Sequence, residues 1–138
     1  MWEYEHRVET SAPASTVWQH WSDMAKWPTW NAGIAAIHVD GPFVVGTTFT
    51  MTPPDGDPIR MQVTGIVPGT EFVDEMDAGD FVVRTVHRLE RLDGGRTGVV
   101  YRTEISGPAA DEVGPELGPA ITADFPDVLR ALVSLAER

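Results

Sequence analysis

The stretch GPELGPAITADFPDVLRALVSLAER, residues 114–138, decides the fold. Its apolar residues recur at steps of three and four, which places them on one face of a helix. The members of this stripe are Leu117, Ile121, Phe125, Val128, Leu132 and Leu135. The opposite face carries Asp127, Arg130, Ser134 and Glu137. An amphipathic helix must bury its stripe against another element, because propensity alone stabilises it little.

A proline interrupts this predicted helix. Pro126 lies inside the periodic run, where it removes one backbone hydrogen bond and pushes on the preceding turn. We therefore expect a kink near Phe125, or a helix in two parts. The Gly-Pro steps at 114–115 and 118–119 make the start irregular, so the well-formed part is predicted over residues 119–137.

The rest of the chain reads mainly as strands separated by turns. Alternating or apolar runs that end at Gly, Pro and Asp clusters predict strands. These runs span residues 2–10, 34–39, 43–52, 59–67, 70–76, 81–92 and 97–106. Between the first two, residues 13–21 predict a short helix opened by Pro13, and residues 23–27 a second one stopped by Pro28. Turns recur every 8–15 residues without a helix between them, so the sheet is predicted to be antiparallel.

This element order predicts an α+β fold in one domain over residues 1–138. A curved seven-stranded sheet would wrap around the long C-terminal helix, with two short helices after the first strand. A cone-shaped sheet is a competing fold, but there the long helices precede most strands. Space between sheet and helix is where a binding site is expected.

Composition narrows the classes of function. The net charge of −11 and the pI of about 4.6 leave no basic footprint for nucleic acid. Cysteine is absent, which excludes disulfides and thiolate chemistry. No apolar, positively charged leader opens the chain and no apolar run reaches about 18 residues, so we expect a cytoplasmic protein without a membrane span. A homodimer is left open.

Several motifs together resemble the START-like, polyketide cyclase/dehydrase (SRPBCC) superfamily. The motifs are VETSAPASTVW (8–18), Asp23 followed by Trp27 or Trp30, Gly46-Thr47, LERLDGGRT (89–97) and Gly107 at the end of the last strand. The resemblance covers essentially the whole chain. It implies a helix-grip fold with a deep apolar cavity that binds a hydrophobic small molecule. It implies no single reaction, because members of the superfamily include carriers, receptors and cyclases.

Strand parity predicts which residues face that cavity. The inward faces of the strands carry five polar residues: His6, Thr85, His87, Tyr101 and Thr103. The expected apolar ligand contacts are Phe49, Met51, Met61, Phe72, Phe81, Val83, Ile121 and Phe125. Trp27 and Trp30 flank an irregular segment and either close the cavity mouth or plug the core under a loop. A one-residue slip in strand register would exchange these assignments.

His87 is the strongest candidate for acid–base chemistry, with Tyr101 beside it, because imidazole titrates near neutral pH. The alternative is a core histidine held by a hydroxyl neighbour such as Tyr101. Asp74 and Asp124 are ambiguous: each carboxylate either faces the cavity or lies in water. The spacing of the four histidines predicts no metal site, and no motif predicts a cofactor.

Three functions are compatible with these observations. The first is binding of a lipid, polyketide-like or aromatic small molecule in the cavity. The second is an enzyme of the polyketide cyclase or dehydratase type that moves a proton through His87 and Tyr101. The third is a partner-binding module with a filled interior. The first two functions require a cavity between sheet and helix, and the third does not.

Overall fold

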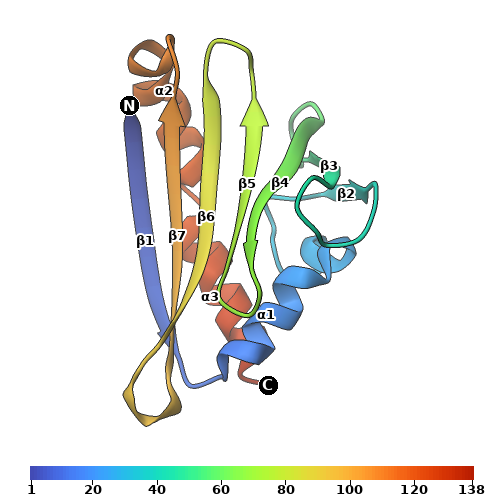
Figure 1. Ribbon diagram of the computed structural model, residues 1–138, viewed down its shortest axis with the longest axis vertical. Coiled ribbons are helices and arrows are strands. Elements are labelled where there is room, and N and C mark those ends of the chain that lie inside the picture. The colour runs from blue at the N-terminus through green and yellow to red at the C-terminus, as the bar shows by residue number, and fades with distance from the viewer.

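The computed structural model describes residues 1–138 and contains one seven-stranded antiparallel sheet with the strand order β1-β7-β6-β5-β4-β3-β2. The strands are β1 (Trp2–Thr10), β2 (Ala36–Val39), β3 (Thr48–Thr52), β4 (Ile59–Val67), β5 (Glu71–Asp77), β6 (Val82–Arg91) and β7 (Thr97–Ser106). The helices are α1 (Ala14–Ser22), α2 (Ala110–Thr122) and α3 (Phe125–Ala136), with short 3-10 turns η1 (Met24–Thr29) and η2 (Asp93–Gly95). The predicted helix-grip architecture is confirmed, and Figure 1 shows α2 and α3 running behind the sheet.

The sheet is a meander from β2 to β7, to which β1 is added at the far edge. Each strand from β2 onward pairs with the next, while β1 pairs with β7, so that Trp2 lies opposite Ile105 and Thr10 opposite Thr97. The predicted strands 2–10, 59–67 and 97–106 match the observed bounds. The predicted strand 43–52 is too long, because its first part forms a turn around Gly46, whose φ of 99° favours glycine.

The C-terminal helix begins nine residues earlier than predicted. α2 starts at Ala110 rather than at residue 119, because Gly114 and Gly118 allow it to pack closely on the Trp2 side chain of β1. The interruption at Ala123 and Asp124 separates α2 from α3 and confirms the helix in two parts. Pro126 causes no further break, since it lies in the first turn of α3, where its missing N–H is not needed.

α3 carries the main core of the protein. Its buried side chains include Phe125, Val128, Leu129 and Leu132. Leu129, which is fully buried, lies outside the predicted stripe, whereas Leu135 is only half-buried, so the buried face is wider than the sequence spacing indicated. None of the helices combines the length and the apolar character that crossing a membrane requires.

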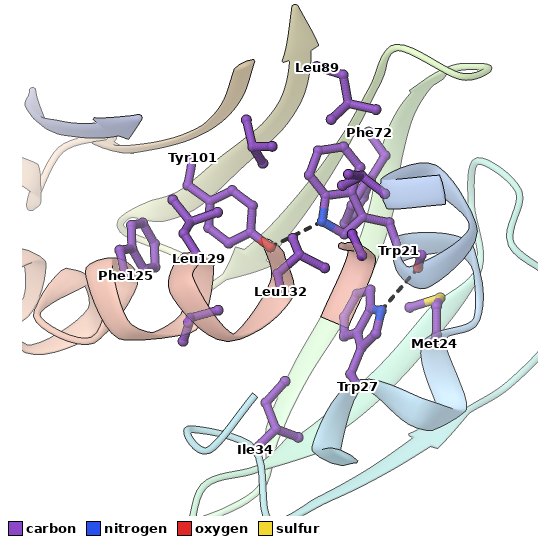
Figure 2. Packing of buried hydrophobic residues seen from close by; sticks show 14 of the residues in the cluster. Trp21, Met24, Trp27, Ile34, Phe72, Leu89, Tyr101, Phe125, Leu129 and Leu132 are labelled. Atoms are coloured by element: carbon purple, nitrogen blue, oxygen red, sulfur yellow. Dashed lines mark hydrogen bonds between the residues drawn. The ribbon is translucent and has the colours of Figure 1, made fainter. Parts of the chain in front are cut away.

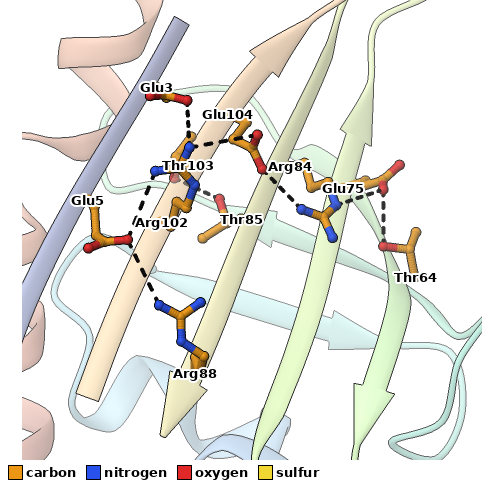
Figure 3. A network of polar contacts seen from close by, with 10 residues as sticks. All are labelled: Glu3, Glu5, Thr64, Glu75, Arg84, Thr85, Arg88, Arg102, Thr103 and Glu104. Carbon is orange, nitrogen blue, oxygen red and sulfur yellow. Dashed lines mark hydrogen bonds and ion pairs between the residues drawn. The ribbon is translucent and has the colours of Figure 1, made fainter. Parts of the chain in front are cut away.

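The outer face of the sheet is covered by charged residues in cross-strand pairs, among them Arg84, Arg102 and Glu104 (Figure 3). Arg84 Nη1 donates to Glu104 Oε1 at 3.1 Å, and Arg102 pairs with Glu3 on β1. Exposed pairs of this kind contribute at most about 1 kcal/mol each. These pairs are more informative about the site than about stability. With Arg84, Arg102 and Glu104 on the outer face, the alternate residues of β6 and β7 point to the inner face.

Candidate functional site

A cavity of about 520 Å³ lies between the inner face of the sheet and the C-terminal helices. Fifteen of its 24 lining residues are hydrophobic, so the walls are mainly apolar. Exposed residues mark its rim: Pro54 and Asp55 between β3 and β4, Ile59 at the start of β4, and Ala120 on α2. The third predicted function requires a filled interior; a cavity at this place favours the first two functions, and the choice among the three stays a prediction.

Eleven of the residues predicted from the sequence line the cavity. They are Trp27, Trp30, Met51, Met61, Phe72, Val83, Thr85, His87, Tyr101, Ile121 and Phe125. Strand parity found the seven strand residues among them, because these point to the face that the helices cover. Their role in binding a ligand stays a prediction.

Four predicted residues lie outside the lining: His6, Phe49, Phe81 and Thr103. Phe49 is fully buried and packs edge-on against Trp27, with ring centroids 5.6 Å apart, so it supports the wall from behind. Thr103 is buried and shares a 2.9 Å hydrogen bond with Thr85, which takes the position toward the cavity. His6 lies on the edge strand β1, and Phe81 precedes β6 and packs in a second apolar cluster. Parity identified the face of these residues but not their distance from the hollow.

Aromatic residues form part of the cavity lining, and Figure 2 shows how three of them, Trp21, Trp27 and Tyr101, lie in the core. Trp21 Nε1 donates a 3.1 Å hydrogen bond to the hydroxyl of Tyr101, and Trp27 Nε1 donates to the Trp21 carbonyl at 3.0 Å. Trp27 is almost fully buried and lines the cavity as well, so it is both a core residue and part of the wall. Trp18 is only half-buried and packs edge-on against Trp21.

His87 faces the cavity but is poorly suited to accept a proton. Its ring stacks on Phe72, with centroids 3.9 Å apart, and Nδ1 donates to the Phe72 carbonyl oxygen at 3.3 Å. Burial lowers the pKa of His87 to about 3, so the ring is neutral near pH 7. The predicted hydrogen bond to Tyr101 does not form; the two rings instead meet edge to face at 4.7 Å.

Asp74 is the buried carboxyl group of the site. It lies on the central strand β5 opposite Thr85 of β6, with only 4% of the residue exposed. Burial, and to a smaller degree the charge of Glu75, raises the pKa of Asp74 to about 8. The group is therefore mainly protonated near neutral pH.

Asp124 is a second carboxyl group of the lining, at the interruption between α2 and α3. It is half-buried, and a Cβ on Gly33 would come within 2.5 Å of its Oδ2 atom. Burial raises the pKa of Asp124 as well. The spacing of the apolar residues in the sequence left Asp124 between the apolar and the polar face of the predicted helix. In the structure the interruption between α2 and α3 places it in the cavity lining.

Part of the lining comes from residues that sequence reasoning missed. They are Trp21, Asn31, Gly33, Ile34, Pro53, Pro54, Asp55, Ile59, Met76, Ala120 and Val128. Many of these belong to loops, to which helix and strand periodicity does not apply. Met76 and Val128, in contrast, had the periodicity of an inward face. No group of three or more His, Asp or Glu side chains is arranged to hold a metal ion.

The sequence matches a protein family described as polyketide cyclase/dehydrase and lipid transport over residues 1–137. No protein of curated function matches the sequence.

Solved structures with the same fold share little sequence with the chain. Norcoclaurine synthase from Thalictrum flavum, in complex with dopamine and hydroxybenzaldehyde, is 16% identical with a TM-score of 0.77, over 96% of this chain and 84% of that one. A START superfamily protein from Mycobacterium smegmatis is 15% identical with a TM-score of 0.76, over 98% and 97%. A hypothetical protein from Helicobacter pylori is 20% identical with a TM-score of 0.73, over 99% and 86%. At these identities the similarity extends to the fold alone.

Proposed function

The chain belongs to the polyketide cyclase/dehydrase and lipid transport family, and from this premise we propose that it binds a hydrophobic small molecule between the sheet and the C-terminal helices. A lipid, a polyketide-like molecule or an aromatic compound would fit the apolar walls. The observation that carries the proposal is the cavity of about 520 Å³. Apolar surface left facing a hollow of this size costs stability, and a bound apolar ligand would recover it.

The chemistry of the lining favours binding over proton transfer through His87. Pockets that bind small molecules combine apolar walls with a few fixed polar groups, and Thr85, Tyr101 and Asp74 are such groups here. An enzyme of the cyclase or dehydratase type would need a base that is free to accept a proton near pH 7. Burial lowers the pKa of His87 to about 3, which makes its ring a weak base near pH 7 and argues against this role.

A pair of tryptophan variants tests the proposal. Ala120 and Ala123 are both exposed residues at the end of α2, but only Ala120 lies on the rim of the cavity. We expect wild type and Ala123→Trp to bind the neutral dye Nile red with the same affinity and at one dye per chain. Ala120→Trp should bind about tenfold more weakly, because the indole would obstruct the mouth.

Native mass spectrometry of the purified wild type would show in addition whether a ligand from the expression host is retained. Equal affinity of the two variants for the dye, or no dye binding together with no retained ligand, would contradict the proposal. Circular dichroism of both variants checks that neither substitution disturbs the fold.

A further inference from the structure

The cavity has a one-sided distribution of charged residues. Its lining contains three aspartates, Asp55, Asp74 and Asp124, and no lysine or arginine. The chain as a whole carries a net charge of −11. An apolar ligand with a carboxylate or a phosphate would therefore enter without a cationic partner and against like charge.

Asp74 adds an independent observation, because no other residue hydrogen-bonds to its buried carboxyl group, which is reached only by its own backbone N–H. Three other polar side chains of the inner wall are paired: Thr85 with Thr103, His87 with the Phe72 carbonyl, and Tyr101 with Trp21. Trp30 Nε1, also in the lining, is buried without a partner, so the ligand has to offer it an acceptor as well. Buried polar groups without a partner are rare, and one that faces a cavity indicates a missing ligand group.

We propose that the ligand is an apolar molecule with one protonated amine, whose nitrogen donates to the carboxylate of Asp74, with Asp124 as the second negative group of the lining. The assignment rests on the proposed function of the cavity as a binding site. Trp27 and Tyr101 in the same lining are aromatic side chains of the kind that interact favourably with a cation.

Binding of an amine in this place is coupled to a proton. With a pKa of about 8, Asp74 is protonated in most empty molecules at pH 7, and contact with an ammonium group requires the ionised form. The affinity for an amine should therefore rise by up to about tenfold per pH unit between pH 6 and 8. A neutral ligand of the same shape has no reason to show this rise.

Other titratable groups around Asp74 must be considered over the same pH range. They are Glu75 on the same strand, His87 on β6, Tyr101 on β7, Asp124 between the helices and Asp55 on the rim. His87, with a pKa of about 3, is neutral throughout. Burial raises the pKa of Tyr101 above its usual value, so its hydroxyl keeps its proton. Burial also raises the pKa of Asp124, so a separate variant of Asp124 is needed to distinguish its titration from that of Asp74.

Three probes with one ring system test the assignment: naphthylethylamine, naphthylethanol and naphthylacetate. Their affinities for the wild-type chain are measured by isothermal titration calorimetry at pH 6, 7 and 8. We expect the amine to bind at least about tenfold more tightly than the alcohol at pH 8, and the carboxylate more weakly than either. In Asp74→Asn the rise of the amine affinity with pH should disappear, while in Asp124→Asn it should persist.

Titrations in buffers of different ionisation enthalpy give a readout that does not need a variant. At pH 7 the amine should release close to one proton on binding and the alcohol none. Equal affinities for amine and alcohol, with alcohol binding blocked in Ala120→Trp, would overturn the amine assignment and leave the binding cavity in place. Tighter binding of the carboxylate, or an unchanged pH dependence in Asp74→Asn, would also overturn it. Failure of all three probes to bind, while Nile red still binds, would overturn the amine assignment alone.

Discussion

Replacing Asp74 by Asn should change how the stability of the protein depends on pH. Burial raises the pKa of Asp74 from 3.8 to about 8, so the folded chain keeps a proton that the unfolded chain has lost in this range. Stability therefore falls as the pH rises toward 8, by up to about 1.4 kcal/mol per pH unit. The free energy of unfolding levels off above the folded pKa.

His87 acts in the opposite direction over part of this range. Burial lowers its pKa from 6.5 to about 3, so below about pH 6.5 the unfolded chain binds a proton that the folded chain does not. Its contribution to stability therefore rises with pH and is complete above about pH 6.5. Between about pH 4 and 6.5 the effects of His87 and Asp74 oppose each other, and above about pH 6.5 His87 no longer opposes the effect of Asp74.

The wild-type chain should accordingly lose roughly 2 kcal/mol of stability between pH 6.5 and 8, which is about 1.5 pH units at 1.4 kcal/mol each. Asp74→Asn should show no such loss, because the amide does not titrate. Urea denaturation at several pH values in this window, followed by tryptophan fluorescence, measures both slopes. Asp57→Asn, an exposed aspartate outside the cavity lining, is the matched control and should follow the wild type. A fall of equal size in Asp74→Asn, or a wild-type stability that rises to pH 8, would refute the reasoning.

Two further predictions concern packing. Leu132→Ala removes a fully buried side chain of α3 and should cost about 2–5 kcal/mol in urea denaturation, whereas Leu135→Ala, at a half-buried position, should cost less; a neutral Leu132→Ala would contradict the assigned helix face. Gly118→Ala should destabilise the wild-type chain, since the new Cβ would overlap the indole of Trp2, but should stabilise a Trp2→Ala background by up to about 1 kcal/mol through helix propensity. Equal effects of Gly118→Ala in the two backgrounds would exclude this contact as the cause.

Much of the fold was predictable because its local patterns agree with one another. Alternation over residues 2–10 and 97–106 gave the bounds of β1 and β7, and Pro126 correctly predicted a helix in two parts. The start of α2 was not predictable in the same way. Gly114 and Gly118 are poor helix formers by themselves, and it is their contact with Trp2, far away in the sequence, that favours the helix there.

The sequence predicted which residues lie on the inner face of the sheet, but not which of them line the cavity. Parity placed Phe72, Thr85 and His87 toward the helices, because side chains of a strand alternate strictly. The same rule selected His6, which lies on the inner face of an edge strand and outside the cavity lining. The raised pKa of Asp74 was not predictable either. It results from the burial of the carboxyl group in the folded chain, and the residues beside Asp74 in the sequence give no sign of that burial.

The position of β1 has a consequence for how the chain folds. Of the seven strands, β1 is synthesised first, yet its only partner in the sheet is β7, and the paired residues Trp2 and Ile105 lie about a hundred positions apart. Closing so long a loop is entropically unfavourable and slows folding. During synthesis β1 therefore stays without its partner strand until β7 has been made.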